Sequence, residues 1–218
     1  MKHVCYTVVI GLIATFSAAR SASAATLTPI LGPGGFLSPT TITNDFETGA
    51  PETAPANTPQ FTFEGTALLG TASSWTANTT SSGVQGLVES IANEPMRIVF
   101  TTPVNEVGMF FGNDDFNLVF NANLELFDAG NASLGSVQVL SNANDFADQY
   151  IGVRSDTAAK SAAIYYDRPA AQQVSVYIDD LKVGLVPEPS GVALAVWGVL
   201  GLAASAGILR TGRYGRRG

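Results

Sequence analysis

Histidine and cysteine are almost absent from this sequence: its 218 residues contain one of each, His3 and Cys5. Both lie within the first 24 residues, which we expect to be removed on export. A chain that lacks them cannot use Ser-His-Asp or Cys-His nucleophilic arrangements, His/Cys zinc sites or a disulfide framework. The chemistry left to the mature chain is that of carboxylates, Lys, Tyr, or a metal ion held by oxygen ligands.

Residues 1–24 have the pattern of a secretory signal peptide. Lys2 supplies a positive charge, the residues up to Ala19 are mostly apolar, and Ala22-Ser23-Ala24 fits the small-residue cleavage pattern. Cleavage between Ala24 and Ala25 is therefore predicted. The apolar run is shorter than a comfortable membrane span, which argues against an uncleaved anchor.

Basic residues are scarce between residues 25 and 186. This segment contains 17 acidic and five basic side chains, a formal net charge of −12, whereas the whole chain carries −7. Phosphate backbones are bound by basic patches, so the composition argues against a nucleic-acid partner. It suits a soluble exported domain and it suits cation binding.

The segment 42–185 also lacks helical periodicity. Apolar and polar residues instead alternate with a period of two, which predicts half-buried strands, and the breaks are rich in turn-forming Gly, Asn, Asp and Pro. We expect an all-β domain, an antiparallel β-sandwich of jelly-roll type, after a loose segment at 25–41 that can include one edge strand. Loops are expected at 48–60 and in the polar stretch 71–83, for which an edge strand is the alternative. The strands are expected at 86–91, 96–101, 104–111, 117–120, 122–127, 136–140, 150–154, 162–166 and 173–183.

The longest uncharged run lies near the C-terminus, at residues 191–209. Nineteen helical residues measure about 28 Å, close to the hydrocarbon thickness of a bilayer, so a transmembrane helix is predicted. Pro187-Glu188-Pro189 precedes it, and a basic tail at 210–218 follows. Arginines favour the cytoplasmic side and anionic head groups, and the tail contains Arg210, Arg213, Arg216 and Arg217.

Residues 186–218 together resemble the PEP-CTERM sorting signal of Gram-negative bacterial surface proteins. The resemblance rests on Pro187-Glu188-Pro189, the apolar run and the arginine tail, in that order. It implies recognition by exosortase, a membrane protease-transpeptidase, with transient anchoring in the inner membrane and then transfer to the cell surface or extracellular matrix. That family is associated with exopolysaccharide, which implies a non-catalytic surface or matrix protein linked to extracellular polysaccharide.

Carboxylates gather at the two ends of the expected sandwich. Asp45-Phe46-Glu47 is placed in an early strand and Asp179-Asp180 in the last strand, where the apolar face shifts and predicts a β-bulge. First and last strands of a sandwich often neighbour each other, and carboxylates from both would suit an oxygen-only calcium site. These motifs resemble jelly-roll carbohydrate-binding modules, which implies Glu47 and Asp179 or Asp180 as ligands of a structural calcium ion. Solvated or turn-capping carboxylates are the alternative.

Three further features leave alternatives open. Asn113-Asp114-Asp115 has calcium-binding residue types without the spacing of an EF-hand, and turn formation explains it without a metal. Five aromatic residues could stack on sugar rings or pack in the core: Trp75, Tyr150, Tyr165, Tyr166 and Tyr177. No carboxylate pair is singled out for glycoside hydrolysis. We therefore expect a protein that is not an enzyme and requires no cofactor, with a calcium-stabilised carbohydrate-binding module and a carboxylate-based glycoside hydrolase as the alternatives.

Overall fold

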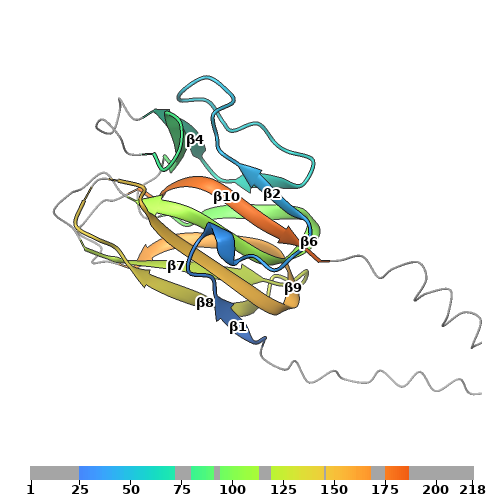
Figure 1. The fold of residues 1–218 in the computed structure, drawn as a ribbon. Helices are drawn as coiled ribbons and strands as arrows, with labels where there is room; N and C mark the ends of the chain where they lie inside the picture. Colours follow the sequence, from blue (N-terminus) through green and yellow to red (C-terminus); the bar gives the residue numbers. More distant parts are fainter. Residues whose placement is uncertain are drawn as a thin grey trace, which may run out of the picture.

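The computed structural model describes residues 25–71, 80–90, 94–112, 119–144, 146–167 and 175–186. Within these ranges the regular structure is β-strand, apart from one 3-10 turn, and all strand pairs are antiparallel (Figure 1). The predicted signal peptide, Trp75, Asn113-Asp114-Asp115 and the chain from Pro187 onward lie outside the described residues. In the part of the chain that is described, no helix is long and apolar enough to cross a membrane.

Most strands coincide with the alternating segments of the sequence. They are β1 (Leu27–Pro29), β2 (Thr41–Asn44), β3 (Phe61–Glu64), β4 (Ala67–Thr71), β5 (Gln85–Glu89), β6 (Met96–Gly112), β7 (Asn121–Phe127), β8 (Ser133–Leu140), β9 (Gln149–Asp167) and β10 (Tyr177–Leu185), with the 3-10 turn η1 at Pro33–Gly35. β3 and β4 were not predicted. The strand expected at 117–120 is wrong for Val119 and Phe120, which lie outside any strand.

The two longest strands, β6 and β9, form the frame of the sandwich. Their mutual register is interrupted between Val99 and Val104, and residues 101–103 there are exposed. Before this interruption, β3 flanks β6, and β7 and β8 continue from β9. After it, β6 pairs with β10, which pairs in turn with β2 and β5. One sheet thus bends over itself into two layers, which confirms the predicted antiparallel β-sandwich (Figure 1).

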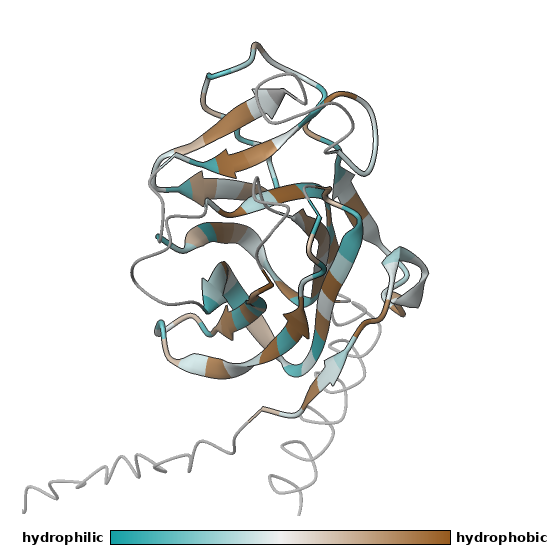
Figure 2. Cartoon of the chain, turned by 90° about the vertical axis from the view of Figure 1, so that its left-hand side faces the viewer, coloured by the Kyte–Doolittle hydropathy of each residue, from teal (hydrophilic) through white to brown (hydrophobic). Residues whose placement is uncertain are grey.

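Apolar side chains at alternate positions fill the space between the layers. Met96 and Ile98 enter the core from one half of β6, and Met109 and Phe111 enter from the other half. All four are fully buried, and the alternation of hydropathy along the strands is visible in Figure 2. Burial of such side chains is the main driving force for the fold, so the period of two in the sequence fixes which face of each strand points inward.

The chain between β1 and β2 crosses the outer face of β9, β6 and β10, and residues 30–40 are called the strap below. Ile30 is buried against Gly152, where a Cβ atom would lie 2.9 Å from the Ile30 Cβ. A Cβ atom at Gly184 would lie 2.6 Å from the Ser38 hydroxyl oxygen. The strap therefore approaches the sheet so closely that both positions require glycine.

An ion pair between a buried carboxylate and a half-buried arginine attaches the strap to the sheet. The Glu106 carboxylate accepts hydrogen bonds from the backbone N–H groups of Leu37 and Ser38, each at 2.8 Å. The Arg154 Nε atom lies 2.6 Å from Glu106 Oε1, and the guanidinium also donates to the Gly35 carbonyl oxygen at 2.7 Å. The segment 25–41, which was expected to be loose, is thus bound to the sheet along its length. The bonds to Glu106 are needed because a buried carboxylate without hydrogen-bond donors would destabilise the fold.

Candidate functional site

The two ends of the domain meet where β2 pairs with β10. Leu181 lies opposite Asn44, and the register of β10 against β6 shifts between Asp179 and Lys182. Asp180 adopts a left-handed conformation with φ of 48°. The predicted neighbourhood of the early and last strands and the predicted β-bulge are therefore confirmed.

The prediction that Asp45-Phe46-Glu47 lies within a strand is wrong, because β2 ends at Asn44. The Asn44 Oδ1 atom accepts a hydrogen bond from Phe46 N at 2.9 Å, and Asp45 Oδ1 accepts one from Glu47 N at 3.2 Å. Phe46 has a φ of 58°. Asn and Asp side chains form such local turns readily, so the chain leaves the sheet here and directs the Glu47 carboxylate toward the loop at residues 81–85.

Three carboxylates converge on this loop, and Glu47, Asp179 and Asp180 are called the carboxylate cluster below. Glu47 Oε1 accepts hydrogen bonds from Val84 N at 2.8 Å and Gln85 N at 2.9 Å. Asp179 Oδ2 accepts hydrogen bonds from Ser81 N, Ser81 Oγ and Ser82 N at 2.8, 2.8 and 2.9 Å. Ser82 Oγ donates to Asp180 Oδ1 at 2.9 Å. The cluster thus binds the 81–85 loop to both ends of the domain.

Burial makes the Asp179 carboxyl group a weaker acid than an exposed aspartate. Its side chain is fully buried, and this desolvation raises its pKa to about 6, although hydrogen bonds from Ser82 and Ser81 act in the opposite direction. The nearby charge of Asp180 also raises the pKa. The carboxylate therefore changes its charge in the mildly acidic range, where an exposed Asp is already ionised.

The cluster can be compared with the needs of a calcium ion, which takes six to eight oxygen ligands. Among the described residues, no group of three or more Asp, Glu, His or Cys side chains is placed to hold a metal ion. Asp179 Oδ2 already accepts hydrogen bonds from two backbone N–H groups. A calcium ion at the three carboxylates would have to replace these donors, and the calcium site stays a prediction.

Sequence reasoning missed the partners of the cluster. Ser81, Ser82 and Gly83 lie in a stretch expected to be a polar loop, about 100 positions away in the sequence from Asp179. Gly83 has a φ of 55°, and a Cβ atom there would lie 2.1 Å from Glu47 Cδ. The Ser-Ser-Gly sequence was the available signal, because successive N–H groups in such turns form anion-binding concavities.

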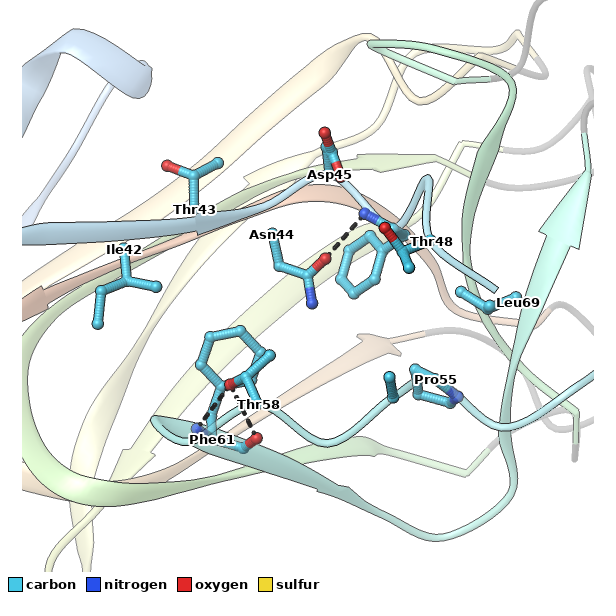
Figure 3. Close-up of a pocket in the computed structure, with 11 residues that line it drawn as sticks. Ile42, Thr43, Asn44, Asp45, Thr48, Pro55, Thr58, Phe61 and Leu69 are labelled. Carbon is cyan, nitrogen blue, oxygen red and sulfur yellow. Dashed lines mark hydrogen bonds between the residues drawn. The ribbon is translucent and has the colours of Figure 1, made fainter. Parts of the chain in front are cut away.

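A cavity of about 370 Å³ lies beside the cluster, between β2 and the proline-containing loop after it (Figure 3). The Asn44 side chain lies in its wall, with its Nδ2 atom turned away from the hydrogen bond to Phe46. The lining residues are Ile42, Thr43, Asn44, Asp45, Phe46, Thr48, Pro55, Ala56, Thr58, Phe61 and Leu69.

Hydrogen bonds hold the loop that forms the far wall of this cavity. Glu52 N donates to the Leu69 carbonyl at 2.7 Å, and Leu69 N donates to the Thr53 carbonyl at 2.9 Å. Thr58 Oγ1 accepts a hydrogen bond from Phe61 N at 3.1 Å. The predicted loop at 48–60 is confirmed, and these bonds give the cavity a preformed shape.

The aromatic candidates are distributed between the core and the surface. Tyr166 is 8% exposed and Tyr177 is 1% exposed, so both belong to the interior. Tyr165 is half-buried, which confirms that the adjacent pair Tyr165 and Tyr166 faces opposite sides of the strand. Tyr150 packs edge-on against Phe110, with ring centroids 5.2 Å apart. Core packing is thus the observed role of Tyr166 and Tyr177.

Comparisons with known proteins find similar structures at low sequence identity. No family profile and no curated protein sequence matches the chain. The K2 cleaved adhesin domain of Lys-gingipain is 12% identical, with a TM-score of 0.48, and the match covers 67% of this chain and 98% of that one. The CBM22-1 xylan-binding domain from Paenibacillus barcinonensis is 16% identical, with a TM-score of 0.39, covering 67% and 94%.

A third similar structure is a DUF4465 family protein from Bacteroides caccae, which is 9% identical, with a TM-score of 0.42. That match covers 74% of this chain and all of the other. At these identities and scores, the similarity assigns neither a ligand nor an activity to this chain.

Proposed function

We propose that this chain is an exported, non-catalytic surface or extracellular-matrix protein, sorted by an exosortase-type transpeptidase and linked to extracellular polysaccharide. Its β-sandwich is the part displayed outside the cell, and its C-terminal segment anchors it in the inner membrane until sorting. The resemblance of Pro187-Glu188-Pro189, residues 191–209 and the arginine tail to the PEP-CTERM signal supports the sorting step.

The positions of the first and last described strands, relative to the two predicted cleavage sites, are the main support for this proposal. Among the described residues, the first strand begins at Leu27, three residues after Ala24, and the last strand ends at Leu185, two residues before Pro187. Removal of residues 1–24 and cleavage near Pro187-Glu188-Pro189 would therefore leave every described strand intact. A domain that must survive processing at both ends needs this arrangement.

Replacement of Pro187-Glu188-Pro189 by three alanines is expected to leave the protein in the membrane fraction at its unprocessed mass, because the protease would lose its recognition motif. The measurement is fractionation of the producing cells followed by mass spectrometry. The matched control replaces Pro51 and Glu52, which form a second Pro-Glu pair in an exposed loop, by alanine. Normal processing of the triple variant would contradict the sorting proposal.

The cavity beside β2 favours a second candidate function, a carbohydrate-binding module. Sugars present hydroxyl groups and apolar C–H faces, and sites for them combine a few polar groups with an apolar lining. The Asn44 amide supplies a polar group here, whereas the Thr43 and Asp45 side chains point to the opposite side of β2 (Figure 3). Phe46 and Phe61 belong to the apolar part of the lining. The cavity is large enough for one or two sugar rings, within the usual range for small-ligand sites of about 300–1,000 Å³.

The binding candidate predicts that filling the cavity abolishes retention on polysaccharide. Ala56 is exposed on the loop that lines the cavity, and Ala56→Trp would place an indole ring in it. We expect at least a roughly tenfold loss of affinity in polysaccharide affinity gels, while Ala129→Trp, at the exposed turn after β7, leaves binding unchanged. Equal retention of both variants, or no retention of the parent chain on any polysaccharide, would contradict this candidate.

Calcium binding by Glu47, Asp179 and Asp180 stays a prediction of the same candidate. A ligand that binds only the folded state raises the melting temperature in proportion to the logarithm of its excess concentration. The test compares thermal unfolding in excess calcium and in chelator, with Glu47→Gln as the variant expected to lose any difference. Superimposable melting curves of the parent chain would remove the calcium site.

A further inference from the structure

One end of the sandwich is the end from which the chain leaves toward its predicted anchor. β10 ends at Leu185, whose N–H donates to the Thr40 carbonyl oxygen at 3.1 Å, so the strap ends beside the exit point. From Val186 to Gly191, where the predicted transmembrane run begins, an extended chain spans at most about 18 Å. The strap is thus held close to any bilayer that contains the C-terminal segment.

The strap exposes the two most solvent-accessible large apolar side chains of the described residues. Leu31 is 93% exposed and Leu37 is 75% exposed, and they flank the turn η1. The strap backbone beneath them is fixed by the Glu106–Arg154 pair and by Lys182 Nζ, which donates to the Pro33 carbonyl at 2.9 Å. Leucines held outward on a fixed support present an apolar patch, and such patches mark interaction surfaces.

The charge on the domain is distributed unevenly along β10. Arg154, Lys160 and Lys182 are three of the five basic residues between 25 and 186, and strand pairing places all three around the Leu185 end. Glu106 at this end is buried and paired, and Asp156 adds one exposed negative charge. The carboxylate cluster lies toward the other end, about 20 Å away along the strand. The exit end is therefore the one that anionic lipid head groups would attract.

We propose that the strap rests on the lipid bilayer while the chain is anchored, with Leu31 and Leu37 entering the head-group region. This rests on the proposed anchoring by the C-terminal segment. Two leucines alone would bind a bilayer weakly, but a short tether converts the contact into an intramolecular one with an effective concentration on the order of millimolar. The contact fixes the orientation of the domain, with the carboxylate cluster and the cavity beside β2 directed away from the membrane.

Site-specific labelling of the mature chain (residues 25–218) tests this orientation directly. This chain contains no cysteine, so Leu37→Cys, Leu31→Cys and Leu140→Cys each provide one attachment site for an environment-sensitive fluorophore. Leu140 is 60% exposed on β8 and serves as the matched control. The labelled proteins are reconstituted into phosphatidylethanolamine–phosphatidylglycerol vesicles that carry nitroxide lipids as quenchers.

We expect quenching at positions 31 and 37 to be roughly threefold or more stronger than at position 140, with a blue-shifted emission, because only the strap reaches the head groups. Flotation of the vesicles tests the C-terminal anchor separately from the contact between the strap and the bilayer. A chain that floats, with equal quenching at all three positions, would overturn the orientation and leave the anchor intact. A chain that does not float would overturn both the anchor and the contact that depends on it.

Discussion

Arg154→Met is expected to lower the free energy of unfolding by about 3 kcal/mol, because it leaves the buried Glu106 carboxylate without its cation. The Glu106 side chain is 1% exposed and lies 2.6 Å from the Arg154 Nε atom. Burial alone would raise the pKa of Glu106, but hydrogen bonds from Ser38, Leu37 and Arg154 outweigh it and hold the pKa below its usual range. Denaturant unfolding at neutral pH measures the loss.

Two comparisons make this result specific. Lys160→Met removes another basic side chain that donates to a backbone carbonyl, of Thr101, and its expected effect is within about 0.5 kcal/mol because the group is exposed. The double variant Glu106→Gln with Arg154→Met should recover part of the loss, since no uncompensated charge remains. A loss for Arg154→Met as small as that for Lys160→Met would show that the strap does not depend on the ion pair.

The second large effect is a pH dependence that originates at Asp179. Its pKa is raised to about 6 in the folded protein, above the value near 3.9 of an unfolded Asp. The folded state therefore binds more protons than the unfolded state between these values, so the contribution of Asp179 to stability is fully present below pH 4 and is lost as the pH rises through 6. One pKa unit corresponds to about 1.4 kcal/mol, so the whole loss is on the order of 3 kcal/mol, of which about 2 kcal/mol falls between pH 4 and pH 7.

Asp179→Asn carries no titrating group and should not show this loss. We expect the variant to be less stable than the parent chain at pH 4, because the amide nitrogen that replaces a carboxyl oxygen cannot accept a hydrogen bond. The difference is expected to shrink by about 2 kcal/mol at pH 7. Ser81→Ala is the control, since it removes one hydrogen bond to Asp179 and keeps the carboxylate. A difference between parent and Asp179→Asn that stays constant or widens with pH would contradict the assignment.

The local pattern of apolar and polar residues was sufficient to predict most strands. It was insufficient to predict that the segments 96–101 and 104–111 form one bent strand, β6. Thr101, Thr102 and Pro103 interrupt the alternation of β6, and the sequence alone suggests a turn there. The chain bends instead of reversing, because Val99 pairs with Ser161 on one side of the interruption and Val104 pairs with Ala159 on the other. Contacts between residues about 60 positions apart decide this, and no local propensity encodes them.

The same distinction applies to the candidate site. The bulge at Asp179-Asp180 could be predicted because the apolar face of β10 changes between Ile178 and Leu181 within four residues. The Ser-Ser-Gly sequence of the 81–85 loop signals an anion-binding turn, but the place of the loop beside β10 could not be predicted, since a polar stretch carries no hydrophobic period. The cavity beside β2 arises where the turn at Phe46 meets the loop held by Leu69, two features whose positions depend on the completed sheet.

The position of β10 has a mechanical consequence. Any pulling force applied to the chain beyond Leu185 enters the domain through this strand, which is bonded to β6 on one side and to β2 and β5 on the other. A pull along a strand held on both sides loads its hydrogen bonds in shear, so many must break together before the strand slides. A C-terminal attachment of the kind we propose would therefore pull on a strand whose hydrogen bonds resist the load together.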